Sequence, residues 1–102
     1  MDGVRRIDRI VAEFHVWLDD SFPFAKMKVR VIERDPGNLL AVANVGVRNI
    51  KSREREYISG LAGTVEDAVN DLLVRFIAGV RENTPMSGLT ESDFDWSTHE
   101  DF

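Results

Sequence analysis

The segment from residue 64 to residue 83 constrains the fold most strongly, because its pattern is that of an amphipathic helix. Its apolar residues recur at spacings of three and four, so they form one broad stripe. Thr64 and Asp67 are spaced as in a capping box, and early acids suit the positive end of the helix dipole. Such a stripe needs a sheet to cover it. The stripe consists of Val65, Ala68, Val69, Leu72, Leu73, Phe76, Ile77 and Val80.

A first helix is predicted from about residue 3 to residue 20. Asp2 or Gly3 is placed to cap it, and its apolar residues again follow helical spacing. Pro23 favours its end, because proline disfavours helical geometry at the preceding residue. The predicted apolar face comprises Val4, Ile7, Ile10, Val11, Phe14, Trp17 and Leu18.

Between these two segments the apolar period changes to two, which is typical of strands. In the first predicted strand, basic residues alternate with apolar ones, so one face is wet and the other buried. Pro36 and Gly37 then predict a tight turn into a second strand over residues 39–50. A third strand is predicted over about residues 54–61. The alternating residues are Lys26, Lys28 and Arg30 against Met27, Val29 and Val31.

We therefore expect an α+β fold of two layers in the order α-β-β-β-α. Three antiparallel strands would form the sheet, with both helices on one face and the other face open to solvent. This domain would span residues 1–83. Pro85 breaks the second helix, so residues 84–102 would form an acidic C-terminal tail.

The net charge of −5 is located in this tail. All 13 Lys and Arg lie in residues 1–83, where as many acids balance them, whereas the tail has five acids and no base. The tail also contains Leu89, Phe94, Trp96 and Phe102. Acids mixed with large apolar rings suit docking on a basic surface of a partner. Packing of the same rings on the tail's own domain is an equally good interpretation.

The primary hypothesis is a small non-enzymatic protein-binding domain that occludes a basic surface of another protein. Charge would steer the encounter, and Phe94 and Trp96 would fix the complex. The predicted partner-binding residues are Glu91, Asp93, Phe94, Asp95, Trp96, Glu100, Asp101 and Phe102 of the tail, with Glu66, Asp67 and Asp71 of the second helix.

The alternative hypothesis is nucleic-acid binding through the basic sheet face, with the acidic tail as an intramolecular competitor. Base stacking needs aromatic residues, and only Tyr57 lies on these strands. A solvated face balanced by neighbouring acids is the simpler interpretation. A third hypothesis is a homodimer made through the open sheet face or the edge strands. The basic residues concerned are Lys26, Lys28, Arg30, Arg48, Lys51, Arg53 and Arg55.

No catalytic, cofactor or metal signature is present, so we expect neither an enzyme nor a cofactor. The lack of cysteine removes disulfides, thiolate catalysis and Cys-based zinc sites, and fits a reducing cytoplasm. His15 has no second metal ligand at helical spacing, and His99, Glu100 and Asp101 lack a third fixed ligand, so a solvated acidic end is the simpler interpretation. No apolar run approaches the ~20 residues of a membrane span, so no membrane association is expected.

The predicted element order over residues 3–83 resembles that of double-stranded-RNA-binding domains. In that family, the loop between the first two strands and the start of the second helix contact RNA; residues 35–37 and 64–68 hold these places here. The strand-to-helix junction around Gly63 and Thr64 resembles that of HicB-type antitoxins. Size, acidity and element order resemble those of small phage inhibitors, including some anti-CRISPR proteins. These resemblances imply an inhibitor or regulator of phage or mobile-element type.

Overall fold

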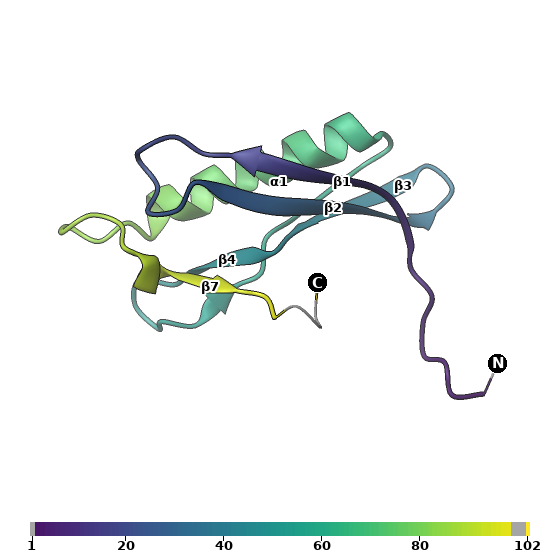
Figure 1. Cartoon of the computed structure of the whole chain (residues 1–102), viewed down its shortest axis with the longest axis horizontal. Coiled ribbons are helices and arrows are strands. Elements are labelled where there is room, and N and C mark those ends of the chain that lie inside the picture. The colour runs from purple at the N-terminus through teal and green to yellow at the C-terminus, as the bar shows by residue number, and fades with distance from the viewer. Residues whose placement is uncertain (1, 99–101) are drawn as a thin grey trace.

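A computed structural model describes residues 2–98 and residue 102 of the chain. Within these residues the fold contains one α-helix and two antiparallel sheets (Figure 1). The first sheet has four strands in the order β1-β2-β3-β6, and the second has three in the order β5-β4-β7. The elements are β1 (Arg9–Trp17), β2 (Lys26–Asp35), β3 (Asn38–Ala43), β4 (Val45–Arg48), β5 (Arg55–Glu56), β6 (Ser59–Ala62), α1 (Val65–Glu82), the 3-10 helix η1 (Glu91–Asp93) and β7 (Phe94–Trp96).

The helix predicted over residues 64–83 is confirmed as α1. The Thr64 side chain accepts a hydrogen bond from the backbone N–H of Asp67 at 3.2 Å, as the capping pattern predicted. Its apolar stripe packs on the first sheet, where Leu72 and Phe76 are fully buried. Gly60 of β6 makes this close contact possible, because a Cβ there would overlap the backbone of α1.

The alternation in β2 is also confirmed, since Met27, Val29 and Val31 are all buried under α1. The predicted turn joins β2 to β3 as an antiparallel hairpin. Gly37 lies in this turn with φ 76°, a backbone conformation that glycine adopts without steric cost.

The first predicted helix is wrong, because residues 9–17 form β1, which pairs antiparallel with β2. Helical spacing of its apolar residues competes with strand propensity, and this segment is rich in β-branched and aromatic side chains. Pairing with β2 points Phe14 and Val16 toward α1, opposite the buried residues of β2, and His15 to the other face. The order α-β-β-β-α, with two helices on one face of the sheet, is therefore incorrect.

The predicted three-stranded sheet is also incorrect, because the second and third predicted strands each divide between two sheets. The second bends at Asn44 into β3 and β4, and the third divides into β5 and β6. Asn44 holds the bend: its side chain accepts from the Lys28 N–H at 2.8 Å, and its own N–H donates to the Lys28 carbonyl at 3.0 Å. β4 thus leaves the first sheet and becomes the centre of the second.

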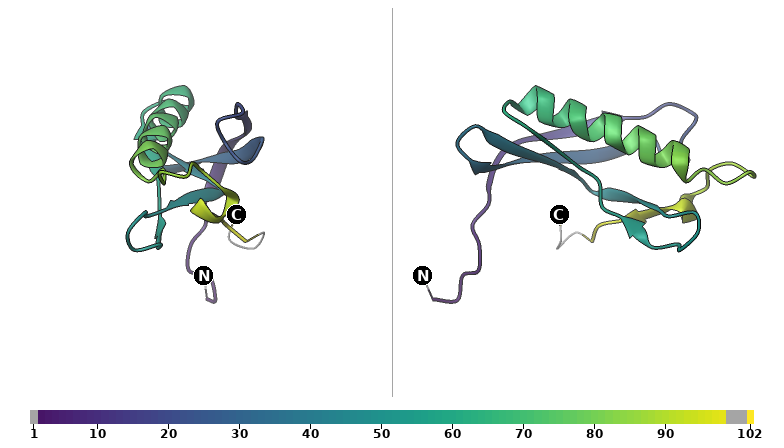
Figure 2. Two further views of the ribbon diagram at one scale, coloured as in Figure 1. Left: turned by 90° about the vertical axis from the view of Figure 1, so that its left-hand side faces the viewer. Right: turned by 180° about the vertical axis from the view of Figure 1, so that it is seen from behind.

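The C-terminal segment completes this second sheet through β7, which pairs with β4. Phe94 is 4% exposed, and its ring meets that of Phe24 edge-on at 4.9 Å between centroids. Figure 2 shows α1 along one side of the first sheet, with β4 and β7 toward the other. The segment after α1 therefore extends the core of the body.

Candidate binding groove on the open sheet face

We call the face of the first sheet opposite α1 the open face. Because side chains alternate along a strand, the residues of β2 between the buried ones lie on this face. They keep the basic character that the sequence predicted. These residues are Lys26, Lys28, Arg30, Ile32 and Arg34.

A row of four aliphatic side chains crosses the open face, one from each strand. Ile10 of β1 is paired with Ile32 of β2, which is paired in turn with Leu40 of β3. Leu40 is paired with Leu61 of β6. The two outer members, Ile10 and Leu61, are 49% and 55% exposed. This aliphatic row is therefore accessible from solvent.

A groove of about 530 Å³ runs along most of the aliphatic row, and we call it the basic groove. Its floor contains Ile10, Ile32 and Leu40, and its walls contain four arginines and two aromatic rings. This volume lies within the range typical of ligand pockets. The wall residues are Arg6, Arg30, Arg34, Arg55, Tyr57 and Phe102.

Two wall residues of the groove, Arg30 and Arg55, each carry a buried hydrogen-bond donor, and that of Arg55 lies beside Gly46 of β4. The Nε of each is buried and has no acceptor among the described residues. Arg30 lies 4.0 Å from a carboxylate oxygen of Glu13, and its guanidinium carbon lies 4.4 Å from the centroid of the Phe102 ring. Arg55 donates to the Ser97 hydroxyl at 2.9 Å and stacks on Tyr57 at 4.7 Å. Buried donors are normally satisfied, so these two set the groove apart from the rest of the surface.

The other two wall arginines, Arg6 and Arg34, differ in whether a carboxylate pairs with them. Arg6 pairs with Asp8 at 3.1 Å, whereas Arg34 is exposed and has no ion pair among residues 2–98 and 102. Guanidinium groups bind carboxylates and phosphates through paired hydrogen bonds. The groove can therefore hold an anionic group beside an apolar one.

The basic residues predicted for nucleic-acid binding fall into two separate groups. Lys26, Lys28 and Arg30 share the open face, and Arg55 reaches the basic groove from β5. The remaining three belong to β4 or to the loop after it, on the second sheet. These are Arg48, Lys51 and Arg53.

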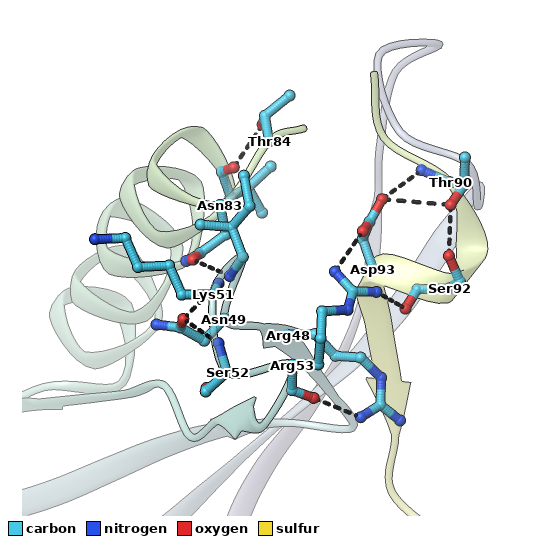
Figure 3. Close-up of polar contacts among 12 residues, drawn as sticks. Arg48, Asn49, Lys51, Ser52, Arg53, Asn83, Thr84, Thr90, Ser92 and Asp93 are labelled. Atoms are coloured by element: carbon cyan, nitrogen blue, oxygen red, sulfur yellow. Dashed lines mark hydrogen bonds and ion pairs between the residues drawn. The ribbon is translucent and has the colours of Figure 1, made fainter. Parts of the chain in front are cut away.

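Two members of this second group, Arg48 and Arg53, contact the C-terminal segment (Figure 3). Arg53 donates to the Asp93 carboxylate at 3.0 Å and to the Ser92 carbonyl at 2.9 Å. Arg48 lies 3.6 Å from the Asp95 carboxylate. Lys51 is in a tight loop in which its backbone N–H bonds to the Asn49 side chain at 2.9 Å. Arg48 and Arg53 thus pair with acids of their own chain.

The predicted partner-binding residues of the tail have different environments. Phe94 and Asp93 are buried in the body and are therefore not available to a partner. A hydrogen bond from the Thr90 N–H lowers the pKa of Asp93, and Arg53 lowers it further. Glu91 is exposed in η1, and Trp96 is 41% exposed with its ring edge-on to Phe24 at 4.8 Å. Glu100 and Asp101 lie outside the described residues.

The three predicted acids on α1 do not line the basic groove, because α1 covers the opposite face of the sheet. Glu66 and Asp67 are exposed in its first turn. Asp71 accepts from the Leu61 N–H at 3.0 Å and from Arg75 at 3.1 Å. The Leu61 hydrogen bond is the main cause that lowers the pKa of Asp71. Helix acids and tail rings therefore form no single surface among the residues that the structure describes.

Sequence reasoning missed the aliphatic row. Ile10 was assigned to a helix, so its place beside Ile32 was not visible. The signal for Leu40 was present, because the tight turn after β2 fixes which residues of β3 lie opposite Ile32. Arg34 continues the alternation of Lys26, Lys28 and Arg30 and belonged with them from the start.

The described residues show no other chemical centre. Residues 2–98 and 102 contain no group of three or more His, Asp or Glu side chains placed to hold a metal ion. His15 is exposed on the open face, and His99 lies outside the described residues. In the same part of the chain, no helix has both the length and the apolar character needed to cross a bilayer. Comparisons with protein-family models, curated proteins and solved structures find no match to this chain.

Proposed function

We propose that the protein is a non-enzymatic binding module whose basic groove receives an acidic, apolar segment of another protein. The observation that supports this most directly is the aliphatic row beside Arg30, Arg34 and Arg55. An apolar side chain of the partner would lie on the row, and flanking carboxylates would meet the guanidinium groups. Such pairing combines apolar burial with charge-assisted hydrogen bonds.

The charge distribution favours carboxylates as the anionic groups. Neither Arg34 nor Arg55 has an ion pair among the described residues, so their charges are not offset there. An incoming carboxylate is a planar, two-oxygen acceptor that matches a guanidinium fork. Three arginines around one groove therefore provide more positive charge than Glu13 offsets.

The apolar floor favours a peptide over a nucleic acid. Ile10, Ile32 and Leu40 are aliphatic, and a stacked base prefers an aromatic surface. The chain itself supplies an example of the proposed contact, since Phe102 lies in the groove with its ring against Arg30. An apolar ring can therefore occupy this groove beside a guanidinium group.

This proposal keeps the protein-binding class expected from the sequence but assigns the contact to a different surface. Phe94 and Asp93 are buried and Asp95 pairs with Arg48, so these three residues of the C-terminal segment would not dock on a partner. Glu91 and Trp96 remain at the surface. The inhibitor role and the cytoplasmic setting stay predictions from the sequence alone.

The test is a selection of random displayed peptides on the immobilised full-length protein, followed by fluorescence anisotropy with the selected peptides. We expect enrichment of peptides in which Asp or Glu flanks an aliphatic or aromatic residue. Arg34→Glu should weaken their binding by at least about tenfold, or roughly 1.4 kcal/mol. Lys51→Glu makes the same charge change at an exposed site outside the groove and should leave binding within about twofold. Absence of enrichment, or equal effects of the two substitutions, would contradict the proposal.

A second candidate function is binding of single-stranded nucleic acid across the open face. The line of Lys26, Lys28 and Arg30 along β2, with exposed Trp17 on β1 and exposed Tyr57 between β5 and β6, favours it. Deleting residues 84–102 is not a clean test, because it would also remove Phe94 from the core. A labelled oligothymidylate and oligouridylate should instead be titrated at several salt concentrations. Tight, salt-sensitive binding that Lys28→Glu abolishes would support this candidate over the peptide.

A further inference from the structure

The first strand is the least covered part of the molecule. β1 is an edge strand of nine residues, and its outer edge faces no strand among the described residues. Residues 2–8 continue from it as an extended arm that leads away from the body (Figures 1 and 2). An edge strand of this length is a template for pairing with another chain unless charge or a covering segment blocks it.

Exposed apolar side chains are concentrated in the same segment. Among the described residues, twelve large apolar side chains are exposed, and six of them fall within residues 4–17. Ile7 and Trp17 are 80% and 70% exposed, respectively. So many exposed apolar side chains in one segment, on both faces of β1 and on the arm before it, indicate that another chain covers this strand. The six are Val4, Ile7, Ile10, Val11, Phe14 and Trp17.

The apolar surface continues from β1 onto α1. A shallow hollow of about 290 Å³ is lined by Phe14 together with Val69 and Leu73 of the helix. Leu73 also lines a second hollow of about 420 Å³, with Val74 and Ile77. α1 therefore leaves an apolar strip exposed beside β1. The sequence predicted that the helix over residues 3–20 would pack on this face of the sheet.

β1 is complementary to itself in one antiparallel register. With Phe14 opposite Phe14 of a second copy, Ala12 lies opposite Val16, Glu13 opposite His15, and Val11 opposite Trp17. Apolar residues then face apolar residues, and the acid faces an imidazole. A register centred on Glu13 would place two carboxylates opposite each other, which is unfavourable. The bulge at Val11 lies outside the regular stretch from Ala12 to Val16 that the Phe14-centred register uses.

We propose that β1 pairs with β1 of a second copy of this chain, so that two four-stranded sheets join into one of eight strands. The two-fold axis would pass midway between the two Phe14 residues, perpendicular to the sheet. Such an axis is the usual symmetry of a homodimer, because one patch then serves both subunits. Both α1 helices lie on one side of this sheet, and their apolar strips face each other across the axis.

The dimer has a consequence for binding that is independent of what the basic groove holds. The same axis places the open faces of both subunits on one side of the sheet. The two grooves then form one bivalent surface, and a partner with two suitable segments gains avidity from it. Dimerisation requires none of the groove arginines, so it can be tested without knowledge of the ligand.

The first experiment measures the mass of the full-length protein by light scattering over a wide concentration range. We expect twice the chain mass of 11.6 kDa at high concentration. Phe14→Lys places two ammonium groups at the axis and should convert the dimer to a monomer. The side chain of Phe14 is 40% exposed, so the lysine stem can lie on the strand with its charge in water. Ile50→Lys, at a 41% exposed position in the loop after β4, is the matched control and should remain dimeric.

The second experiment tests the register through disulfide formation. The chain has no cysteine, so Phe14→Cys introduces a single thiol at the proposed axis. Directly opposed residues of an antiparallel pair are close enough for a disulfide, so mild oxidation should give a covalent dimer rapidly. Ile50→Cys, outside the proposed interface, should cross-link far more slowly. A wild-type monomer at every concentration, or equal cross-linking of the two variants, would overturn the proposal.

Discussion

Two regions adjoin β2, the core under α1 and the edge strand β1, and they differ sharply in how completely their side chains are buried. Toward α1, its residues Met27, Val29 and Val31 are 1% exposed or less, and they meet the fully buried Leu72 and Phe76. Toward the edge of the sheet, the neighbouring strand β1 leaves Phe14 and Trp17 at 40% and 70% exposed. One region is a fully buried core, whereas the other is apolar surface that the described part of the chain does not cover.

This difference shows what a sequence pattern reports. An alternating or helical pattern indicates which residues avoid water, but it does not say which chain supplies the cover. The core under α1 is covered within the chain, so pattern and structure agree there. β1 carries a similar apolar content, and the described chain does not provide its cover.

Phe76→Ala should produce the largest loss of stability, because it removes a fully buried ring from the core under α1. We expect the free energy of unfolding to fall by about 3–5 kcal/mol. Urea denaturation followed by circular dichroism measures the change. Met86→Ala, at a fully exposed position, should change it by no more than about 0.5 kcal/mol. Equal effects would show that the two regions do not differ as described.

Phe94→Ala tests whether the C-terminal segment belongs to the core region. Phe94 is 4% exposed and contacts Phe24, so its loss should reduce stability by about 3 kcal/mol. Trp96→Ala, at a position that is 41% exposed, should cost about 1 kcal/mol. The same urea experiment gives both values. A neutral Phe94→Ala would mean that β7 packs loosely and that its ring is available to a partner.

The parts of the fold that the sequence predicted correctly are those with local causes. The extent of α1 followed from apolar spacing and the Thr64 cap, and the β2–β3 hairpin followed from Gly37 and the alternation before it. Each of these features is determined within a few residues, so no distant partner had to be known.

The errors came from features that depend on distant contacts. Residues 9–17 satisfy a helical spacing, and only pairing with β2 makes them a strand. Asn44 divides a continuous apolar run because its side chain and backbone bond to Lys28. β7 acquires its place by pairing with β4, which composition could not indicate.

The candidate groove was predictable in part for the same reason. Lys26, Lys28 and Arg30 share the open face because alternation is local. Ile10 and Leu61 join them only through the strand order of the sheet. Arg48 and Arg53 looked like members of the same basic face, but a bend and a sheet change direct them to Asp95 and Asp93.

Asn83→Ala should have an intermediate effect, because Asn83 is a polar group within the covered region. Its side-chain amide donates to the Gly79 carbonyl at 2.8 Å, and its side-chain oxygen accepts from the Ile50 N–H at 2.9 Å. Alanine leaves the Ile50 N–H without this acceptor and removes one of the two hydrogen bonds to the Gly79 carbonyl, so stability should fall by about 1–3 kcal/mol. Asn70→Ala, at an exposed helical position, should be neutral or slightly stabilising. An equal response of the two sites in urea would argue that the helix C-terminus is not anchored.

Acidification should lower the stability of the buried region, because Asp93 lies within it. The pKa of Asp93 in the folded state lies below its usual value, so folding favours the ionised carboxylate. Its contribution to stability is therefore present above the pKa of the unfolded state and is lost as pH falls through the folded-state pKa. Asp93→Asn should flatten the decline of the urea midpoint below about pH 4. Glu91→Gln, at an exposed site in the same helical turn, is the control and should leave the decline unchanged.

Trp17→Ala should have the smallest effect on unfolding of the isolated chain, and it sharpens the comparison most. Trp17 is 70% exposed, and its contact with Lys26 at 5.2 Å is a weak surface interaction. In dilute protein the free energy of unfolding should change by no more than about 0.5 kcal/mol. At high concentration β1 is paired, and wild type gains stability from association that the variant lacks. The difference between wild type and Trp17→Ala should therefore grow with concentration, whereas the effect of Phe76→Ala on each folded chain is present even in dilute protein. A Trp17→Ala effect that is independent of concentration would remove the reason to expect a partner at β1.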